Sequence, residues 1–128
     1  MDKNAALQSF FMQFLPAYNE IVIYSMKNLP VYPYITYEGF YAEYDDDINA
    51  TTNINFSTWY REAGLTNIYK MTDRIAKAIP RSGLRIPVDN GYIIIKKASS
   101  PFGSLMGEET DDLVKRMLHR ISVTTFTT

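Results

Sequence analysis

Residues 34–60 read YITYEGFYAEYDDDINATTNINFSTWY and contain two strand-like runs separated by three aspartates. The first run, residues 34–44, is dense in aromatic and β-branched side chains, which are enriched in strands. In the second run, residues 52–60, Ile54 and Phe56 alternate with polar residues, as in a strand with one face in solvent. We therefore predict an antiparallel hairpin with an acidic tip.

Toward the N-terminus, the sequence predicts one helix and then a segment of ambiguous structure. Asn4 is a candidate helix N-cap, and apolar residues follow it at helical spacing: Leu7, Phe10, Phe11 and Phe14. Pro16 should end or kink this helix, because proline lacks the amide donor. Residues 18–27 contain a continuous apolar run without a readable period, so helix and strand both remain possible there.

A second helix is predicted after Gly64, which breaks the strand pattern. Its apolar face consists of Leu65, Ile68, Thr72, Ile75, Ala76 and Ile79. Pro80 should end this helix.

The last third of the chain predicts a second hairpin and a terminal strand. Asn90-Gly91 is a tight-turn signal between the runs 84–88 and 92–96. We expect a loop over residues 98–107, rich in Ser, Gly and Pro, and a strand over residues 113–126.

These elements predict one α+β domain over residues 1–128, with an antiparallel or mixed β-sheet and helices packed on one face. We expect Ile68, Ile75 and Ile79 to face the sheet. The residues expected on the other side of the core are Ile35, Ile54, Phe56, Ile94 and Val123.

The composition is that of a soluble globular protein. Apolar residues make up 46% of the 128 residues and charged residues 21%, and there are no cysteines, which excludes disulfides and thiolate metal sites. The apolar N-terminal stretch is interrupted by polar residues, so we expect neither a signal peptide nor a membrane span. Aromatic residues reach 14%, which suits subunit contacts as well as a core.

The sequence contains no recognisable catalytic, cofactor or metal site. His119 is the only histidine, and no pattern places a carboxylate beside it, so a structural role is expected. The acidic run at residues 45–47 resembles the start of a calcium loop. However, the glycine and glutamate that such a loop needs are replaced by Ala50 and Phe56. We therefore predict that the protein is not an enzyme and has no cofactor.

Basic residues could form one weak surface patch. Arg81, Arg85, Lys96 and Lys97 would come together if the Asn90-Gly91 turn pairs its flanking strands. The net charge of −1 gives no general attraction to a polyanion, so we interpret the patch as a solvated face and expect no sequence-specific nucleic-acid partner.

The order of segments resembles the tail-terminator (tail-completion, or neck) proteins of long-tailed bacteriophages. A short helix leads through a proline-bearing link into Pro33-Tyr34-Ile35-Thr36-Tyr37. An acidic connection, a polar strand and the helix at 68–79 follow, and the chain finishes with a strand that includes residues 115–123. The resemblance covers most of the chain.

The resemblance implies a structural virion protein without catalytic residues. Such a protein is made in the host cytoplasm and forms a homo-oligomeric ring, commonly of six subunits, at the head-proximal end of the tail. The ring ends tail-tube growth and joins the tail to the head connector. Its partners would be copies of itself, the tail-tube protein and a head-completion or connector protein.

Two loops are predicted to face these partners, because functional contacts concentrate on loops held by a rigid scaffold. They contain Asp45, Asp46, Asp47, Ile48 and Asn49 in the first loop, and Ser99, Ser100, Pro101, Phe102, Gly103, Leu105 and Met106 in the second. Ordinary surface loops are the alternative for both.

Other functions remain open at this point. The closest is another head–tail connector, an adaptor or stopper that also forms a ring. A monomeric protein- or ligand-binding module with an aromatic-lined groove is the alternative from a different class.

Overall fold

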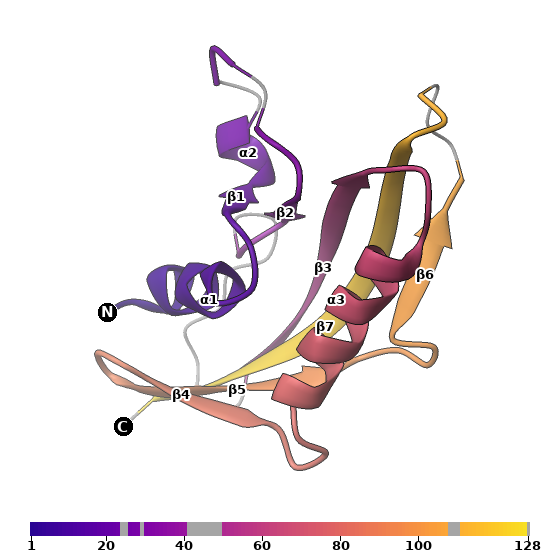
Figure 1. Ribbon diagram of the computed structural model, residues 1–128. Helices are drawn as coiled ribbons and strands as arrows, with labels where there is room; N and C mark the ends of the chain where they lie inside the picture. The colour runs from indigo at the N-terminus through magenta and orange to yellow at the C-terminus, as the bar shows by residue number, and fades with distance from the viewer. Residues whose placement is uncertain (24–25, 29, 41–49, 108–110, 128) are drawn as a thin grey trace.

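The computed structural model describes residues 1–23, 26–28, 30–40, 50–107 and 111–127 (Figure 1). Its longest strands, β3 (Ala50–Arg61) and β7 (Val114–Thr127), are antiparallel neighbours. Their register runs from Ala50 opposite Thr125 to Arg61 opposite Val114. Both strands were predicted to within two residues at each end.

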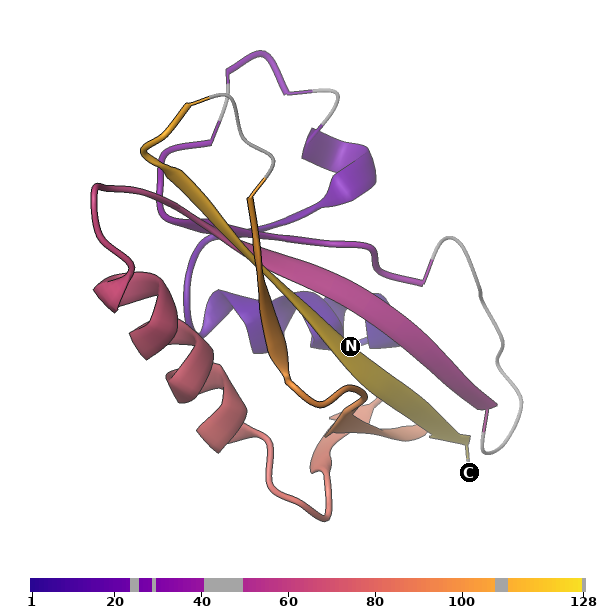
Figure 2. The same ribbon diagram turned by 90° about the vertical axis from the view of Figure 1, so that its right-hand side faces the viewer.

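Shorter strands extend this pair on both sides. β2 (Tyr34–Tyr37) lies antiparallel to β3, and β1 (Ala17–Asn19) is parallel to β2, so the sheet is mixed. On the other side of β7, β5 (Gly91–Lys97) pairs with its second half and β6 (Gly103–Met106) with its first half. β4 (Leu84–Val88) lies outside β5, which confirms the predicted hairpin. The described residues form one curled seven-stranded sheet (Figure 2).

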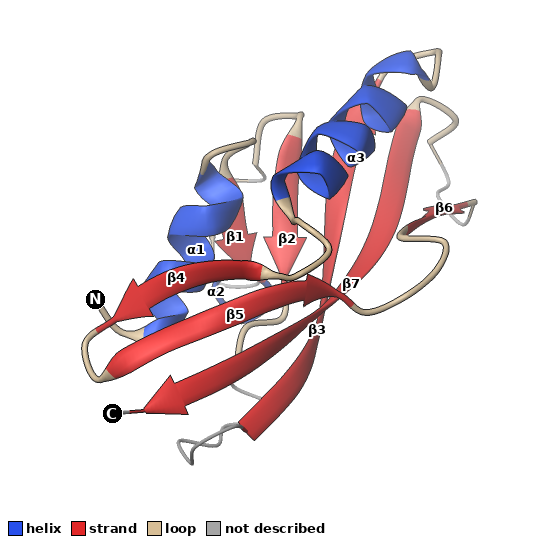
Figure 3. Ribbon diagram, turned by 90° about the horizontal axis from the view of Figure 1, so that it is seen from below, coloured by secondary structure: helices blue, strands red, loops and turns tan. Residues whose placement is uncertain are grey.

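Two helices fill the inner face of the sheet, as predicted (Figure 3). They are α1 (Lys3–Met12) and α3 (Thr66–Ala78). One core cluster joins Phe10 and Phe11 of α1 and Ile75 of α3 with inward-facing strand residues. The buried positions of β3 and β7 that supply this core are Ile54, Phe56, Ile121 and Val123. The α+β class, the mixed sheet and most of the predicted core residues are therefore confirmed.

The N-terminal elements differ from the prediction in detail. Asp2, not Asn4, caps α1, because its Oδ1 accepts a hydrogen bond from the Ala5 amide at 2.8 Å. The ambiguous segment contains both candidate structures: β1 ends at Asn19, and the single-turn helix α2 (Glu20–Ile23) follows directly. The first strand of the predicted hairpin is shorter than expected, since β2 ends at Tyr37 and Gly39 turns the chain with a φ of 73°. The predicted acidic tip lies outside the described residues.

Ile94 was wrongly predicted to face the core. Ile93 and Ile95 are buried instead, because they lie opposite Thr125 and Val123, whose side chains point inward. The run of three isoleucines has no alternation from which the inward face could be predicted. Gly91 helps to set the register, since a Cβ at this position would lie 1.9 Å from the Phe126 carbonyl oxygen.

The stretch 98–107 was predicted as a loop but contains β6. β7 extends beyond the end of β5, and β6 pairs with this extension from Met106 opposite Arg116 to Gly103 opposite His119. The pairing is decided by the length of β7 and not by strand propensity in the Ser/Gly-rich segment.

Truncation of Ile75 tests the packing of α3 on the sheet. Ile75 is 0% exposed, so Ile75→Ala should lower the free energy of unfolding by roughly 2–5 kcal/mol, measured by urea denaturation. Tyr69→Ala is the matched control on the same helix, because the Tyr69 side chain is 52% exposed and its truncation should cost much less. A loss below about 1 kcal/mol for Ile75→Ala would contradict the assignment of this helix face.

Candidate interaction surfaces

The edge of β6 is the first candidate surface. Within the described residues, β6 pairs with β7 alone, so its other edge is left without a neighbouring strand. Leu105, in the middle of β6, is 42% exposed. A pocket of about 340 Å³ lies beside it and is lined by Ala63, Leu65, Leu105, Met106, Gly107, Asp111, Asp112, Val114 and Lys115.

The other edge strands of the described sheet are less suited to strand addition. β4 contains Pro87, which cannot donate to a neighbouring strand, and the exposed Arg85. β1 is only three residues long. β6 has four residues and contains neither proline nor a charged residue, two of the features that usually protect an edge.

The structure divides the predicted second loop into three parts. Ser99, Ser100 and Pro101 are exposed between β5 and β6. Leu105 and Met106 lie on the β6 edge. In contrast, Phe102 packs toward the core, with its ring centroid 5.0 Å from that of His119.

Gly103 has a packing role as well, because a Cβ there would lie 3.1 Å from the side chains of Met117 and Thr72. The residues of the first predicted loop, Asp45, Asp46, Asp47, Ile48 and Asn49, lie outside the described residues.

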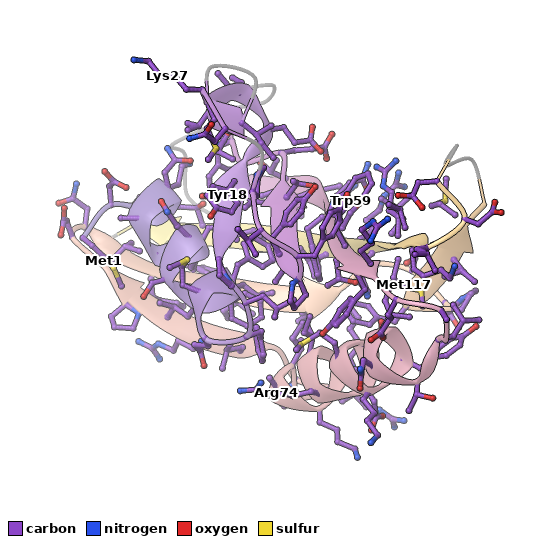
Figure 4. The ribbon with its side chains drawn as sticks, turned by 45° about the horizontal axis from the view of Figure 1, so that its top comes forward. Met1, Tyr18, Lys27, Trp59, Arg74 and Met117 are labelled. Atoms are coloured by element: carbon purple, nitrogen blue, oxygen red, sulfur yellow. The ribbon has the colours of Figure 1, made fainter. Side chains whose placement is uncertain are left out.

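The second candidate surface is an aromatic pocket beside α2, on the sheet face opposite α1 and α3. Its volume is about 350 Å³, and its lining consists of Glu20, Ile23, Tyr34, Thr36, Trp59 and Arg116. The Tyr34 and Trp59 rings are nearly parallel, with centroids 6.0 Å apart. The Tyr18 ring meets Tyr34 edge-on, and the Tyr32 ring is tilted by 45° against it. Figure 4 labels Tyr18 and Trp59 in this region.

Hydrogen bonds hold this pocket in shape. The Trp59 indole Nε1 donates to the Thr36 hydroxyl at 2.9 Å, and the Arg116 guanidinium lies 4.9 Å from the Trp59 ring centroid. Arg116 Nε also donates to the Ser57 hydroxyl at 3.0 Å. Sequence reasoning named none of these residues as a site. The sequence offered one indication of the pocket: Tyr34 and Trp59 occupy outward positions of their strands, where the other residues are polar.

His119 is enclosed in the core between α3 and the sheet. It is 1% exposed, and its ring stacks on Phe56 with centroids 4.5 Å apart and an interplanar angle of 10°. Nε2 is 3.0 Å from the Thr72 hydroxyl, while Nδ1 has no hydrogen-bond partner. The predicted structural role is consistent with this environment, which leaves the ring no access to a substrate.

Burial lowers the pKa of His119 from 6.5 to about 4, because the charged ring would lose its hydration. The Phe56 backbone opposes this shift only in part and does not form a hydrogen bond of normal geometry to Nδ1. At neutral pH the ring is therefore neutral and packs as an aromatic residue.

Neither a metal site nor a membrane helix is found in the described part of the chain. It contains no group of three or more His, Cys, Asp or Glu side chains that could hold a metal ion. None of its helices has the length and apolar character that a membrane span needs. A scan against protein-family models finds no match, and a search of curated proteins finds none either.

The burial of neutral His119 predicts a specific loss of stability in acid. The folded pKa lies below the unfolded value, so the contribution is fully present above pH 6.5 and is lost as the pH falls toward 4. This lowering of the pKa from 6.5 to about 4 corresponds to about 3 kcal/mol in the free energy of unfolding.

Urea denaturation at several pH values between 7.5 and 4 measures this loss. His119→Gln is the control, because glutamine can bond to Thr72 but does not titrate. The difference in stability between the two proteins should change across this window. Parallel curves would contradict the assignment, since carboxylates elsewhere affect both proteins equally.

Proposed function

We propose that this protein is a structural virion protein that forms a ring at the head-proximal end of a phage tail. The observation that carries the proposal is the β6 edge, which has no neighbouring strand among the described residues. Leu105 is exposed there, beside a pocket lined by apolar and charged residues. Such an edge is a template for a strand or loop of another chain. A contact between two different surfaces of identical subunits closes into a ring when the rotation between them permits it.

The order of described elements supports the assignment to the tail-terminator class. α1 leads through Pro30 and Pro33 into β2, and β3, α3 and β7 follow in the positions of the segments on which the resemblance rests. In this role the ring ends tail-tube growth and joins the tail to the head connector. Its partners are further copies, the tail-tube protein and a head-completion or connector protein.

An adaptor or stopper ring would use the same β6 contact. Binding to isolated tail tubes distinguishes a terminator from these connectors, because a terminator binds the end of the tube itself. We place the protein in the virion after its synthesis in the host cytoplasm.

The aromatic pocket favours a second candidate, a monomeric binding module. The stacked Tyr34 and Trp59 rings line this pocket together with Glu20 and Arg116, a combination that suits a small ligand with an apolar body and charged ends. A metabolite that raises the melting temperature of the native protein, but not of Trp59→Ala, would support this function.

Substitution of Leu105 tests the ring proposal. Leu105→Lys should shift the native mass from the ring toward the 14.7 kDa monomer, because the charge must be desolvated in a paired edge. The free monomer should keep its melting temperature, since the lysine stem can reach solvent from this position. Sedimentation analysis and thermal unfolding measure the two effects.

The matched control is Val31→Lys, which introduces the same charge at a side chain that is 84% exposed. It should leave assembly unchanged. If the protein forms rings only on tail tubes, the Leu105→Lys and Val31→Lys variants are compared by their cosedimentation with tubes. Assembly of Leu105→Lys at the wild-type level would contradict a role for the β6 edge.

A further inference from the structure

The strands that form the outer face of the sheet contain basic but no acidic residues. β3, β4, β5 and β7 contain neither aspartate nor glutamate. Their basic residues are Arg61, Arg85, Lys96, Lys97, Lys115, Arg116 and Arg120. The net charge of the whole chain is −1, and the acidic residues that the structure describes lie outside these four strands. One of them, Glu38, accepts a hydrogen bond from the Asn55 amide at 2.6 Å.

Three of these cations form a diagonal line on the outer face, opposite α1 and α3. Arg85 of β4 pairs with Ile94, and Lys96 is the next residue on β5 with the same orientation. Lys96 pairs with Ser122, and Arg120 is the next such residue on β7. Each step crosses one strand and advances two residues, or about 8 Å from the usual strand spacing and rise. Figure 3 shows these strands side by side.

The sequence-based grouping of basic residues was only partly right. Arg85 and Lys96 share the outer face, but Lys97 lies on the inner side, with its Nζ 5.9 Å from the Phe102 ring centroid. Arg120 replaces it in the outer group. We leave Arg116 out of this outer group of cations, because an acidic residue, Glu20, lines the same pocket as Arg116.

The neighbours of the three cations are mainly polar. Thr51 and Thr124 share a hydrogen bond of 2.9 Å, Asn55 accepts one from Arg120 Nε at 2.9 Å, and Asn53 lies opposite Ser122. At one end, the Tyr92 and Phe126 rings stack, and the Arg85 guanidinium lies 3.8 Å from the Tyr92 centroid. The large aliphatic side chains on this face are Ile94 and, two residues from Arg120, Leu118.

This chemistry fits nucleic acid better than a protein partner. The core of a protein interface is apolar and depleted of charge, whereas protein–DNA interfaces are polar and strongly positive. Each DNA strand has one phosphate per 3.4 Å of helix rise, so a line of about 16 Å faces several phosphates. At physiological salt, interactions between exposed charges more than about 8 Å apart are largely screened. The attraction of a phosphate to this face therefore depends on the nearby cations more than on the net charge of the chain.

We propose that the line of Arg85, Lys96 and Arg120 binds the phosphate backbone of DNA without sequence preference. This inference does not depend on ring formation, because all three residues belong to one subunit. Phosphate contacts fix the orientation of a duplex but do not read its bases. The proposal is therefore compatible with the prediction that the protein has no sequence-specific nucleic-acid partner.

Fluorescence anisotropy with a labelled 20-base-pair duplex of mixed sequence tests the proposal on the whole chain. Three phosphate contacts predict a slope of about −2.7 for log K against log salt concentration, or a roughly 40-fold rise in Kd between 50 and 200 mM NaCl. The triple variant Arg85→Gln, Lys96→Gln, Arg120→Gln should bind at least about tenfold more weakly at 50 mM NaCl, with a slope near zero.

The matched control is Lys70→Gln, Arg74→Gln, Lys77→Gln, which changes the net charge equally at exposed positions of α3. It should retain most of the binding. Equal losses of affinity for the duplex in both triple variants, or no binding by the wild-type protein, would overturn the proposal. So would tighter binding of polyglutamate than of the duplex, which would indicate an acidic protein partner. If the triple variant fails to fold, Lys96→Gln alone should reduce the slope by about 1.

Discussion

Antiparallel pairing of β3 with β7, from Ala50 opposite Thr125 to Arg61 opposite Val114, decides which side chains meet on each face of the sheet. It directs Ile54, Phe56 and Ile121 toward the helices and leaves Asn53, Asn55 and Arg120 outside. A slip of one residue would exchange the two faces and expose the core. The length of β7 also allows β5 and β6 to pair with its two halves, so both the hairpin and the β6 edge depend on it.

Much of this fold follows from local sequence patterns. The alternation around Ile54 and Phe56 predicted β3, the spacing of Ile68, Ile75 and Ile79 predicted the buried face of α3, and Asn90-Gly91 predicted the second hairpin. Long-range pairing decided what these patterns left open. Ile94 faces outward because of its register with β7, and the Ser/Gly-rich segment before Gly107 forms β6 because β7 provides a partner. Asp2 caps α1 in place of Asn4, a difference of two positions that propensity alone does not resolve.

The candidate surfaces were less predictable than the fold. Leu105 and Met106 were predicted as partner-facing loop residues and lie on a strand edge, whereas Phe102 from the same loop packs beside His119. The aromatic pocket combines Glu20, Tyr34 and Trp59, which only the pairing of β2 with β3 and the position of α2 bring together. Likewise, Arg85, Lys96 and Arg120 form a line through register across three strands. Sequence shows that such residues exist, but their grouping is a property of the sheet.

The native mass of the wild-type protein, measured by light scattering alone and after mixing with isolated tail tubes, tests the central claim most directly. The ring proposal predicts a closed oligomer several times the 14.7 kDa subunit mass, either free in solution or formed at the end of the tube. Negative-stain images should then show a ring. A monomer that remains monomeric and does not bind tail tubes would contradict the proposal and favour the binding-module function.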